Sequence, residues 1–125
     1  MTERVTVLLV DDAEDCLDTL DVALQTLPGV VVRAAHSAEA AWEMMARDHV
    51  SAVITDIHLP RMTGLELISR IRQEPKWSAL PIVVVSADAD PAAPRTALAS
   101  GANAYFSKPF SPGAVRKKLE ELMNG

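Results

Sequence analysis

The chain has 125 residues, of which 12 are basic and 17 are acidic, and its formal net charge is −5 at neutral pH. This length fits one domain that needs no structural metal, and the single cysteine, Cys16, excludes an internal disulfide and a cysteine-based zinc site. The negative charge argues against nonspecific binding to nucleic acid. No apolar run approaches the roughly 20 residues that cross a bilayer, and residues 1–10 lack the pattern of a secretory signal, so we expect a cytoplasmic protein.

Apolar, β-branched runs alternate with helical patterns along the whole chain. The predicted strands are 5–10, 30–35, 51–55, 81–85 and 103–106. The predicted helices are 14–27, a helix that Ser37 caps, 64–73, a helix within 91–100, and a helix that begins at Ser111-Pro112. Such short crossovers require a parallel sheet with right-handed connections. We therefore predict an α/β fold: a flavodoxin-like, doubly wound sheet of five parallel strands in the order 2-1-3-4-5, with five helices, in one domain over 1–125.

Chemically active side chains follow four of these strands. They are Asp11 and Asp12, Asp56, Ser86, and Lys108 with Pro109, in chain order. Open parallel sheets bind ligands beyond the carboxyl ends of their strands, so these side chains are expected to share one edge. Clustered carboxylates repel one another unless a cation lies between them, and Mg²⁺ prefers one or two carboxylates with water and phosphate oxygens. An ammonium and a hydroxyl suit the remaining oxygens of a phosphoryl group, which predicts phosphoryl transfer onto a carboxylate with Mg²⁺ as cofactor.

Four segments also carry a resemblance to a known family. They are VLLVDDAED at 7–15, ITDIHLPRMTGLELI at 54–68, PIVVVSA at 81–87 and GANAYFSKPF at 101–110. With them the chain resembles the response-regulator receiver domains of bacterial two-component signalling, of the single-domain chemotaxis type, over 5–123. Each segment alone is a weak signal, whereas all four in order, each at the end of a predicted strand, are highly specific.

By that resemblance Asp56 is the phosphoacceptor, which takes a phosphoryl group from a phosphohistidine of a histidine kinase or a phosphotransfer protein. The resemblance also implies metal ligation by Asp11, Asp12, Asp56 and the main-chain carbonyl of His58. Lys108 and Ser86 would contact the phosphoryl oxygens, and Ser86 and Tyr105 would change position when the domain is phosphorylated. The peptide bond before Pro109 would be cis. Phosphorylation would change docking to an unknown downstream protein through the face of the fourth helix, fifth strand and fifth helix. The resemblance implies a monomer or weak dimer with no nucleic-acid or membrane partner, and no enzymatic activity beyond self-catalysed phosphoryl acceptance and slow autodephosphorylation.

Some positions depart from the family pattern. Serine replaces the more usual threonine at position 86 but keeps the hydroxyl, Thr63 stands where an acidic residue is frequent, and DPAAPR at 90–95 is rich in proline where relatives begin the fourth helix. His58 and Asp88 each lie two residues after a site residue. We expect these two side chains to tune the lifetime of the phosphoryl group.

Alternatives to a stand-alone phosphorylated receiver stay open at this point. One is a receiver domain taken from a larger hybrid kinase or regulator, and another is a receiver-like docking module that is never phosphorylated. An enzyme is the rival from another class, but an aspartyl phosphatase would show Asp-x-Asp after the first strand, where Asp11 is followed at that spacing by Ala13. The first loop is not rich in glycine and hydroxyl groups as a flavin phosphate requires, and the nucleotide-binding pattern GxxxxGK[ST] is absent.

Overall fold

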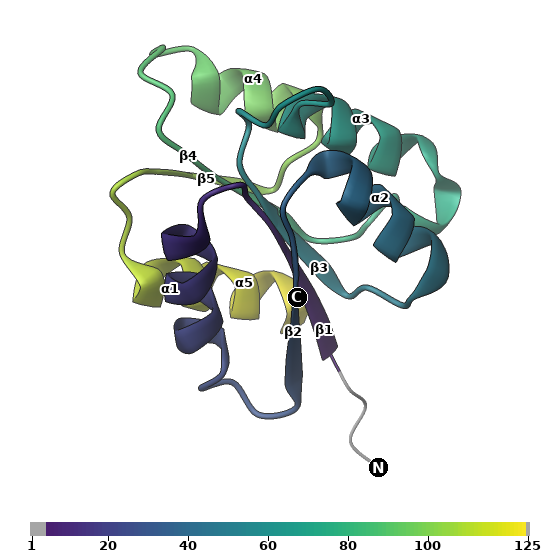
Figure 1. Ribbon diagram of the computed structural model, residues 1–125, viewed down its shortest axis with the longest axis vertical. Coiled ribbons are helices and arrows are strands. Elements are labelled where there is room, and N and C mark those ends of the chain that lie inside the picture. The colour runs from purple at the N-terminus through teal and green to yellow at the C-terminus, as the bar shows by residue number, and fades with distance from the viewer. Residues whose placement is uncertain (1–4, 125) are drawn as a thin grey trace.

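The computed structural model describes residues 5–124, which form a five-stranded parallel sheet with helices on both faces (Figure 1). The strands are β1 (Val5–Val10), β2 (Val30–Ala35), β3 (Ala52–Thr55), β4 (Ile82–Ser86) and β5 (Ala104–Ser107), in the order β2-β1-β3-β4-β5. The helices are α1 (Glu14–Leu24), α2 (Ala38–Arg47), α3 (Gly64–Gln73), the 3₁₀ turn η1 (Pro75–Trp77), α4 (Ala93–Ser100) and α5 (Pro112–Asn124). This confirms the predicted flavodoxin-like order. Within residues 5–124 no helix combines the length and apolar character that crossing a membrane requires.

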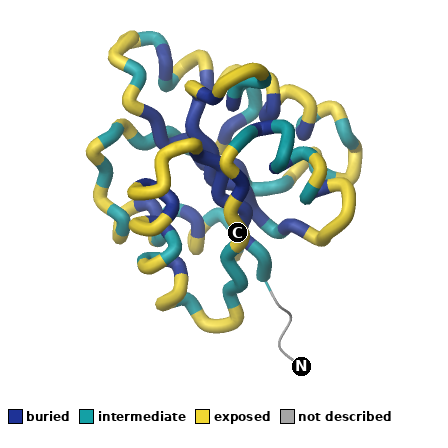
Figure 2. The backbone as a smooth tube through the Cα atoms, in the orientation of Figure 1, coloured by how far each residue is buried: buried dark blue, intermediate teal, exposed yellow. Residues whose placement is uncertain are grey.

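The alternation of side chains along each strand supplies one apolar core on each face of the sheet. Leu8 and Val10 of β1 pack with residues of α2, α3 and α4, whereas Val7 and Leu9 pack with residues of α1 and α5. Figure 2 shows the strands buried at the centre and the outer sides of the helices exposed. Because both faces of the central strands are covered, their sequences read as continuous apolar runs, as is typical of parallel sheets.

The first helix is one turn shorter than predicted. It ends at Leu24, and the Leu27 amide then donates to the Leu24 carbonyl oxygen across 3.0 Å in a tighter turn. The residue before a proline avoids helical backbone angles, so Pro28 ends the helix earlier than the apolar spacing of Leu27 indicates. Gly29, with φ of 75°, completes the turn into β2.

The helix caps follow local sequence signals closely. Ser37 Oγ accepts from the Ala40 amide at 3.1 Å and Ser111 Oγ accepts from the Ala114 amide at 3.2 Å, which confirms both predicted caps. Thr63, a departure from the family pattern, forms a capping box with Glu66 at the start of α3. The last two strands begin and end one residue later than predicted, so Ser86 is the last residue of β4.

One arginine joins three segments on the α3 and α4 side. Arg72 donates from Nε to the Gly101 carbonyl oxygen at 2.9 Å, from Nη1 to the Trp77 carbonyl oxygen at 2.9 Å, and from Nη2 to Asn103 Oδ1 at 3.0 Å. Gly101 has φ of 122°, and a Cβ there would lie 2.6 Å from Arg72 Cγ, so this position requires glycine. Arg72 therefore ties the end of α3 to the turn between α4 and β5.

We predict that Arg72→Ala lowers the free energy of unfolding by about 2 kcal/mol, because three hydrogen bonds from a charged donor are lost and the Gly101 carbonyl oxygen keeps no hydrogen-bond partner among the described residues. The matched control is Arg70→Ala on the same helix, where the side chain is exposed and the expected change is within about 0.5 kcal/mol. Chemical denaturation of both variants measures the difference. Equal losses in the two variants would contradict this role of Arg72.

Candidate functional site

Three charged side chains meet at the carboxyl edge of the sheet. Asp11 directly follows β1, Asp56 directly follows β3, and Lys108 directly follows β5. Lys108 Nζ lies 2.9 Å from Asp11 Oδ2 and 3.0 Å from Asp56 Oδ2. The two carboxylate side chains are only 4% and 10% exposed, so the ammonium balances two nearly buried negative charges.

The second oxygen of each carboxylate is held by the backbone of its own loop. Asp56 Oδ1 accepts from the amides of Ile57 at 2.6 Å and His58 at 3.2 Å. Asp11 Oδ1 accepts from the Ala13 amide at 2.9 Å. Both side chains are therefore oriented before any ligand binds.

The start of α3 packs directly on the backbone of Asp56. A Cβ built on Gly64 would lie 1.9 Å from the Asp56 carbonyl oxygen, so only glycine fits here. The Gly64 amide also donates to the Ile57 carbonyl oxygen at 2.8 Å. Sequence reasoning placed Gly64 at the start of a helix without detecting this contact, because no local pattern reveals which backbone a glycine approaches.

The charge cluster keeps its ammonium protonated and a neighbouring thiol neutral. Burial lowers the pKa of Lys108, but hydrogen bonds to Asp11 and Asp56 outweigh burial and raise the pKa above its usual value. Cys16 is buried on α1, as predicted, and burial together with a hydrogen bond to Asp11 raises the pKa of its thiol to about 12. The thiol is therefore protonated at neutral pH, and the protonated form is not the nucleophile.

A chain of hydrogen bonds links the β4–α4 loop to the β3–α3 loop. Ser86 is fully buried, and its Oγ accepts from the Asp88 amide at 3.2 Å. Asp88 Oδ2 lies 2.9 Å from His58 Nε2, while Asp88 Oδ1 accepts from the Asp90 amide at 2.9 Å. The bond from the Asp90 amide and then the contact with His58 lower the pKa of Asp88. The two side chains that were predicted to tune the site thus contact each other across it.

The remaining predicted site residues lie at the edges of this cluster. Asp12 is exposed, and within residues 5–124 no hydrogen bond joins it to Asp11 or Asp56. Tyr105 is half-buried on β5, and its hydroxyl is buried without a hydrogen-bond partner among the described residues. The Lys108-Pro109 peptide bond is cis, as the resemblance implies.

The donors at this edge are hard oxygens of the kind that Mg²⁺ prefers. Besides the carboxylates of Asp11 and Asp56, the His58 carbonyl oxygen takes part in no hydrogen bond within the described part of the chain. Across residues 5–124 there is no group of three or more histidine, cysteine, aspartate or glutamate side chains arranged to hold a metal. Because Mg²⁺ completes its shell with water and takes only one or two carboxylates, the residues present still fit this ion.

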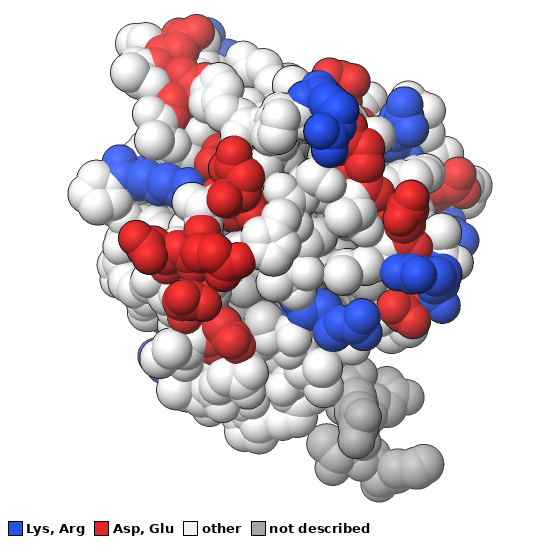
Figure 3. Space-filling view, viewed as in Figure 1, with Lys and Arg blue, Asp and Glu red and all other residues white. Residues whose placement is uncertain are grey.

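Acidic side chains gather over the start of α1, beside the site (Figure 3). The exposed acidic residues there are Asp12, Glu14, Asp15 and Asp18. A surface of one charge sign attracts ions of the opposite sign, so this region favours the approach of cations and basic partners.

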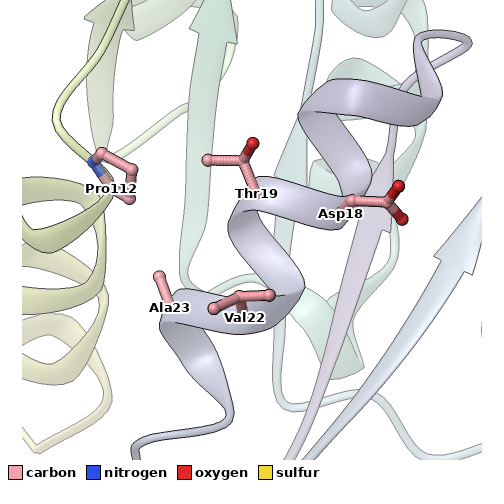
Figure 4. A pocket seen from close by; sticks show the side chains of 5 residues that line it. All are labelled: Asp18, Thr19, Val22, Ala23 and Pro112. Carbon is pink, nitrogen blue, oxygen red and sulfur yellow. The ribbon is translucent and has the colours of Figure 1, made fainter.

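A groove of about 510 Å³ lies on the outer side of α1, facing the first residue of α5 (Figure 4). It is lined by Asp18, Thr19, Val22, Ala23 and Pro112. None of the charged residues at the carboxyl edge lines this groove, so it is a separate surface feature and does not form part of the site.

We predict that Lys108→Met lowers the free energy of unfolding by about 3 kcal/mol, because it leaves two nearly buried carboxylates without their cation. A cation that binds between them should offset this loss, so added MgCl₂ is expected to raise the melting temperature of Lys108→Met more than that of the unsubstituted protein. Thermal unfolding over a range of MgCl₂ concentrations measures both effects. Lys117→Met, at an exposed position of α5, is the control for the loss of one charge.

Comparison with known proteins agrees with this geometry. The family model of the response regulator receiver domain matches residues 7–120. A chemotaxis protein CheY homolog of Campylobacter jejuni is 38% identical over 94 residues, which cover 74% of this chain and 72% of that protein.

Two solved structures extend the similarity over almost the whole chain. A response regulator receiver protein from Pseudomonas putida is 31% identical with a TM-score of 0.82, over 99% of this chain and 98% of the other. The chemotaxis response regulator CheY4 of Vibrio cholerae is 26% identical with a TM-score of 0.85, over 95% of this chain and 98% of the other. The matched range contains the carboxyl end of every strand, and the chain therefore belongs to the response regulator receiver domains of two-component signalling.

Proposed function

We propose that this chain accepts a phosphoryl group on Asp56 from the phosphohistidine of a histidine kinase or phosphotransfer protein, and that this modification controls its docking to another protein. The contact of Lys108 Nζ with both Asp56 and Asp11 is the observation that carries the proposal. It holds an ammonium beside the one nearly buried carboxylate that follows the central strand β3. Membership of the receiver family supports the same assignment.

Each residue at the carboxyl edge of the sheet has a different role in this phosphoryl transfer. A carboxylate oxygen of Asp56 attacks phosphorus, the bond from phosphorus to the histidine nitrogen breaks, and its electron pair stays on the imidazole ring. Lys108 neutralises charge on the phosphoryl oxygens, and Ser86, whose Oγ accepts a hydrogen bond from Asp88, keeps its own hydroxyl proton for donation. Mg²⁺, held by Asp11, Asp12, Asp56 and the His58 carbonyl oxygen, would supply further positive charge at the phosphoryl oxygens.

The loop after β4 connects this chemistry to the α4, β5 and α5 face, which we propose as the docking surface for a downstream protein. Ser86 is the last residue of β4, so a shift of its hydroxyl toward a phosphoryl oxygen moves the loop that leads into α4. Tyr105 lies on the neighbouring strand β5 with an unpartnered hydroxyl, so no hydrogen bond among the described residues opposes its rotation. The switch is therefore assigned to Ser86 and Tyr105 together.

We predict that incubation with acetyl phosphate and MgCl₂ adds one phosphoryl group to the protein, and that Asp56→Asn abolishes this gain. Asparagine keeps the size of the side chain but lacks the nucleophilic carboxylate. Intact-mass measurement checks the result, and omission of MgCl₂ is expected to suppress the gain in the unsubstituted protein.

An absence of phosphorylation would be followed by beryllofluoride binding, which mimics the phosphoryl group without needing transfer from a donor. Failure of both would overturn the proposal in favour of a docking module that acts without phosphorylation. A mass gain that persists in Asp56→Asn would instead show that another side chain is the acceptor.

We further predict that His58→Ala and Asp88→Ala each speed the loss of the phosphoryl group several-fold. The contact between His58 Nε2 and Asp88 Oδ2 spans the two loops that flank Asp56, and its loss opens the approach of water to the acyl phosphate. The double variant is expected to resemble the single variants, since either change removes the same contact. Dephosphorylation measured after removal of acetyl phosphate tests this, with His49→Ala at an exposed position as control; unchanged rates in both single variants would contradict the role.

A further inference from the structure

A carboxylate outside the charge cluster ties α2 to the loop that follows Asp56. Glu39 lies in the first turn of α2, and its Oε2 accepts from the Met62 amide at 3.0 Å. The same oxygen lies 3.4 Å from Nε of Arg61, whose side chain is 71% exposed. The amide contact is therefore the stronger link, because an exposed ion pair contributes little.

The loop needs such a link because its backbone is strained at this point. Arg61 has φ of 65° and is the only residue other than glycine with a positive φ in the described part of the chain. The left-handed region disfavours side chains like arginine and persists where surrounding contacts hold it. Within residues 5–124, the amide contact with Glu39 is the only hydrogen bond that joins backbone groups of 60–62 to another element.

The inward orientation of Glu39 is not explained by stability of the helix. Its Oε1 is buried without a hydrogen-bond partner among the described residues, although the side chain as a whole is 36% exposed. A buried carboxylate oxygen without a donor is unfavourable, whereas an acidic side chain in the first turn favours the helix equally well when it points into water. The hydrogen bond from the Met62 amide lowers the pKa of Glu39, which keeps this inward-facing carboxylate charged.

The loop that Glu39 holds is also the loop that presents the acceptor. It supplies the amides of Ile57 and His58 to Asp56 Oδ1, and it returns to the Asp56 backbone at Gly64. Buried Ile57 and Leu59 hold the start of the loop, α3 begins at its end, and the Met62 side chain packs on the apolar core between them. The contact with Glu39 adds the hydrogen bond that holds the backbone of 60–62 against α2.

We propose that Glu39 is a positioning residue for phosphoryl acceptance: by binding the Met62 amide it fixes the loop that sets the place of Asp56 Oδ1 and of the His58 carbonyl oxygen. This inference rests on the proposed function, since it concerns the same acceptor. Its effect is predicted to fall mainly on the affinity for Mg²⁺, because the His58 carbonyl is the ligand that belongs to the loop itself.

The test compares Glu39→Ala with Glu39→Gln, whose amide oxygen can still accept from the Met62 amide. Phosphorylation by acetyl phosphate is followed over a range of MgCl₂ concentrations, which separates the half-saturating concentration from the limiting rate. For Glu39→Ala we expect the half-saturating concentration to rise by roughly tenfold with a smaller change in limiting rate, and the Met62 amide to exchange hydrogen faster. For Glu39→Gln we expect the half-saturating MgCl₂ concentration and the exchange rate of the Met62 amide to lie within about twofold of those of the unsubstituted protein.

Two further variants separate the amide contact from charge and helix effects. Glu43→Ala removes an exposed carboxylate one turn along α2, and Arg61→Gly removes the ion pair while relieving the strained backbone. Both are expected to match the unsubstituted protein in the dependence on MgCl₂.

Several results would overturn the inference. A Glu39→Ala protein that melts at a lower temperature but keeps its dependence on MgCl₂ would show a structural role alone, and a Glu39→Gln protein as impaired as Glu39→Ala would show that the amide contact is not what matters. If the unsubstituted protein is not phosphorylated while Asp56→Asn behaves identically, the proposed function itself fails. If that protein is phosphorylated and Glu39→Ala equals it in both measurements, only the positioning role fails.

Discussion

The ammonium of Lys108 between the carboxylates of Asp11 and Asp56 is the interaction on which the carboxyl edge of the sheet depends. Two nearly buried negative charges this close together would oppose folding unless a positive charge lay between them. No single strand provides the arrangement, since β1, β3 and β5 each contribute one of the three groups. Because the strands are parallel, their carboxyl ends meet at one edge, and the long lysine side chain reaches from β5 past the end of β4 to β3.

This balance of charge also makes the edge responsive to modification. Under the proposed function, a phosphoryl group on Asp56 brings additional negative oxygens to the place where one ammonium already serves two carboxylates. We propose that the new charge recruits Lys108, whose Nζ already contacts Asp56, and the hydroxyl of Ser86 at the end of the neighbouring strand β4. Ser86 is hydrogen-bonded to Asp88, which contacts His58. A shift of the Ser86 hydroxyl toward Asp56 would therefore move residues of both the β4–α4 loop and the β3–α3 loop.

Most of the carboxyl edge could be predicted from the sequence, because each charged residue directly follows its strand in the chain. An apolar run followed at once by Asp11, Asp56 or Lys108 gives both the strand and the position of the charge at its end, and the parallel topology then brings the ends together. The contacts that were missed join residues distant in the chain: Glu39 with Met62, and Arg72 with Gly101 and Asn103. No spacing rule encodes such pairs, because they depend on how α2, α3 and α4 lie on the finished sheet. The predicted end of α1 was wrong for a different reason. Leu27 continues the apolar periodicity of the helix, but Pro28 restricts the backbone of the residue before it and ends the helix earlier.

The two helices next to the site, α3 and α4, differ in the number and burial of the contacts that hold them. This difference decides which helix moves more easily when Asp56 is modified. α3 is anchored at its start by the contact of Gly64 with the Asp56 backbone and at its end by Arg72, and it buries Leu67, Ile68 and Ile71. α4 has eight residues and buries only Ala93 and Ala97, so it removes much less apolar surface from water. The loop before α4 is held by short-range hydrogen bonds that run from Ser86 Oγ through Asp88 to Asp90 and the Ala92 amide, the last two of them exposed. Displacing α4 therefore costs less free energy than displacing α3, which favours the α4, β5 and α5 face as the part that moves when the donors around Asp56 are redistributed.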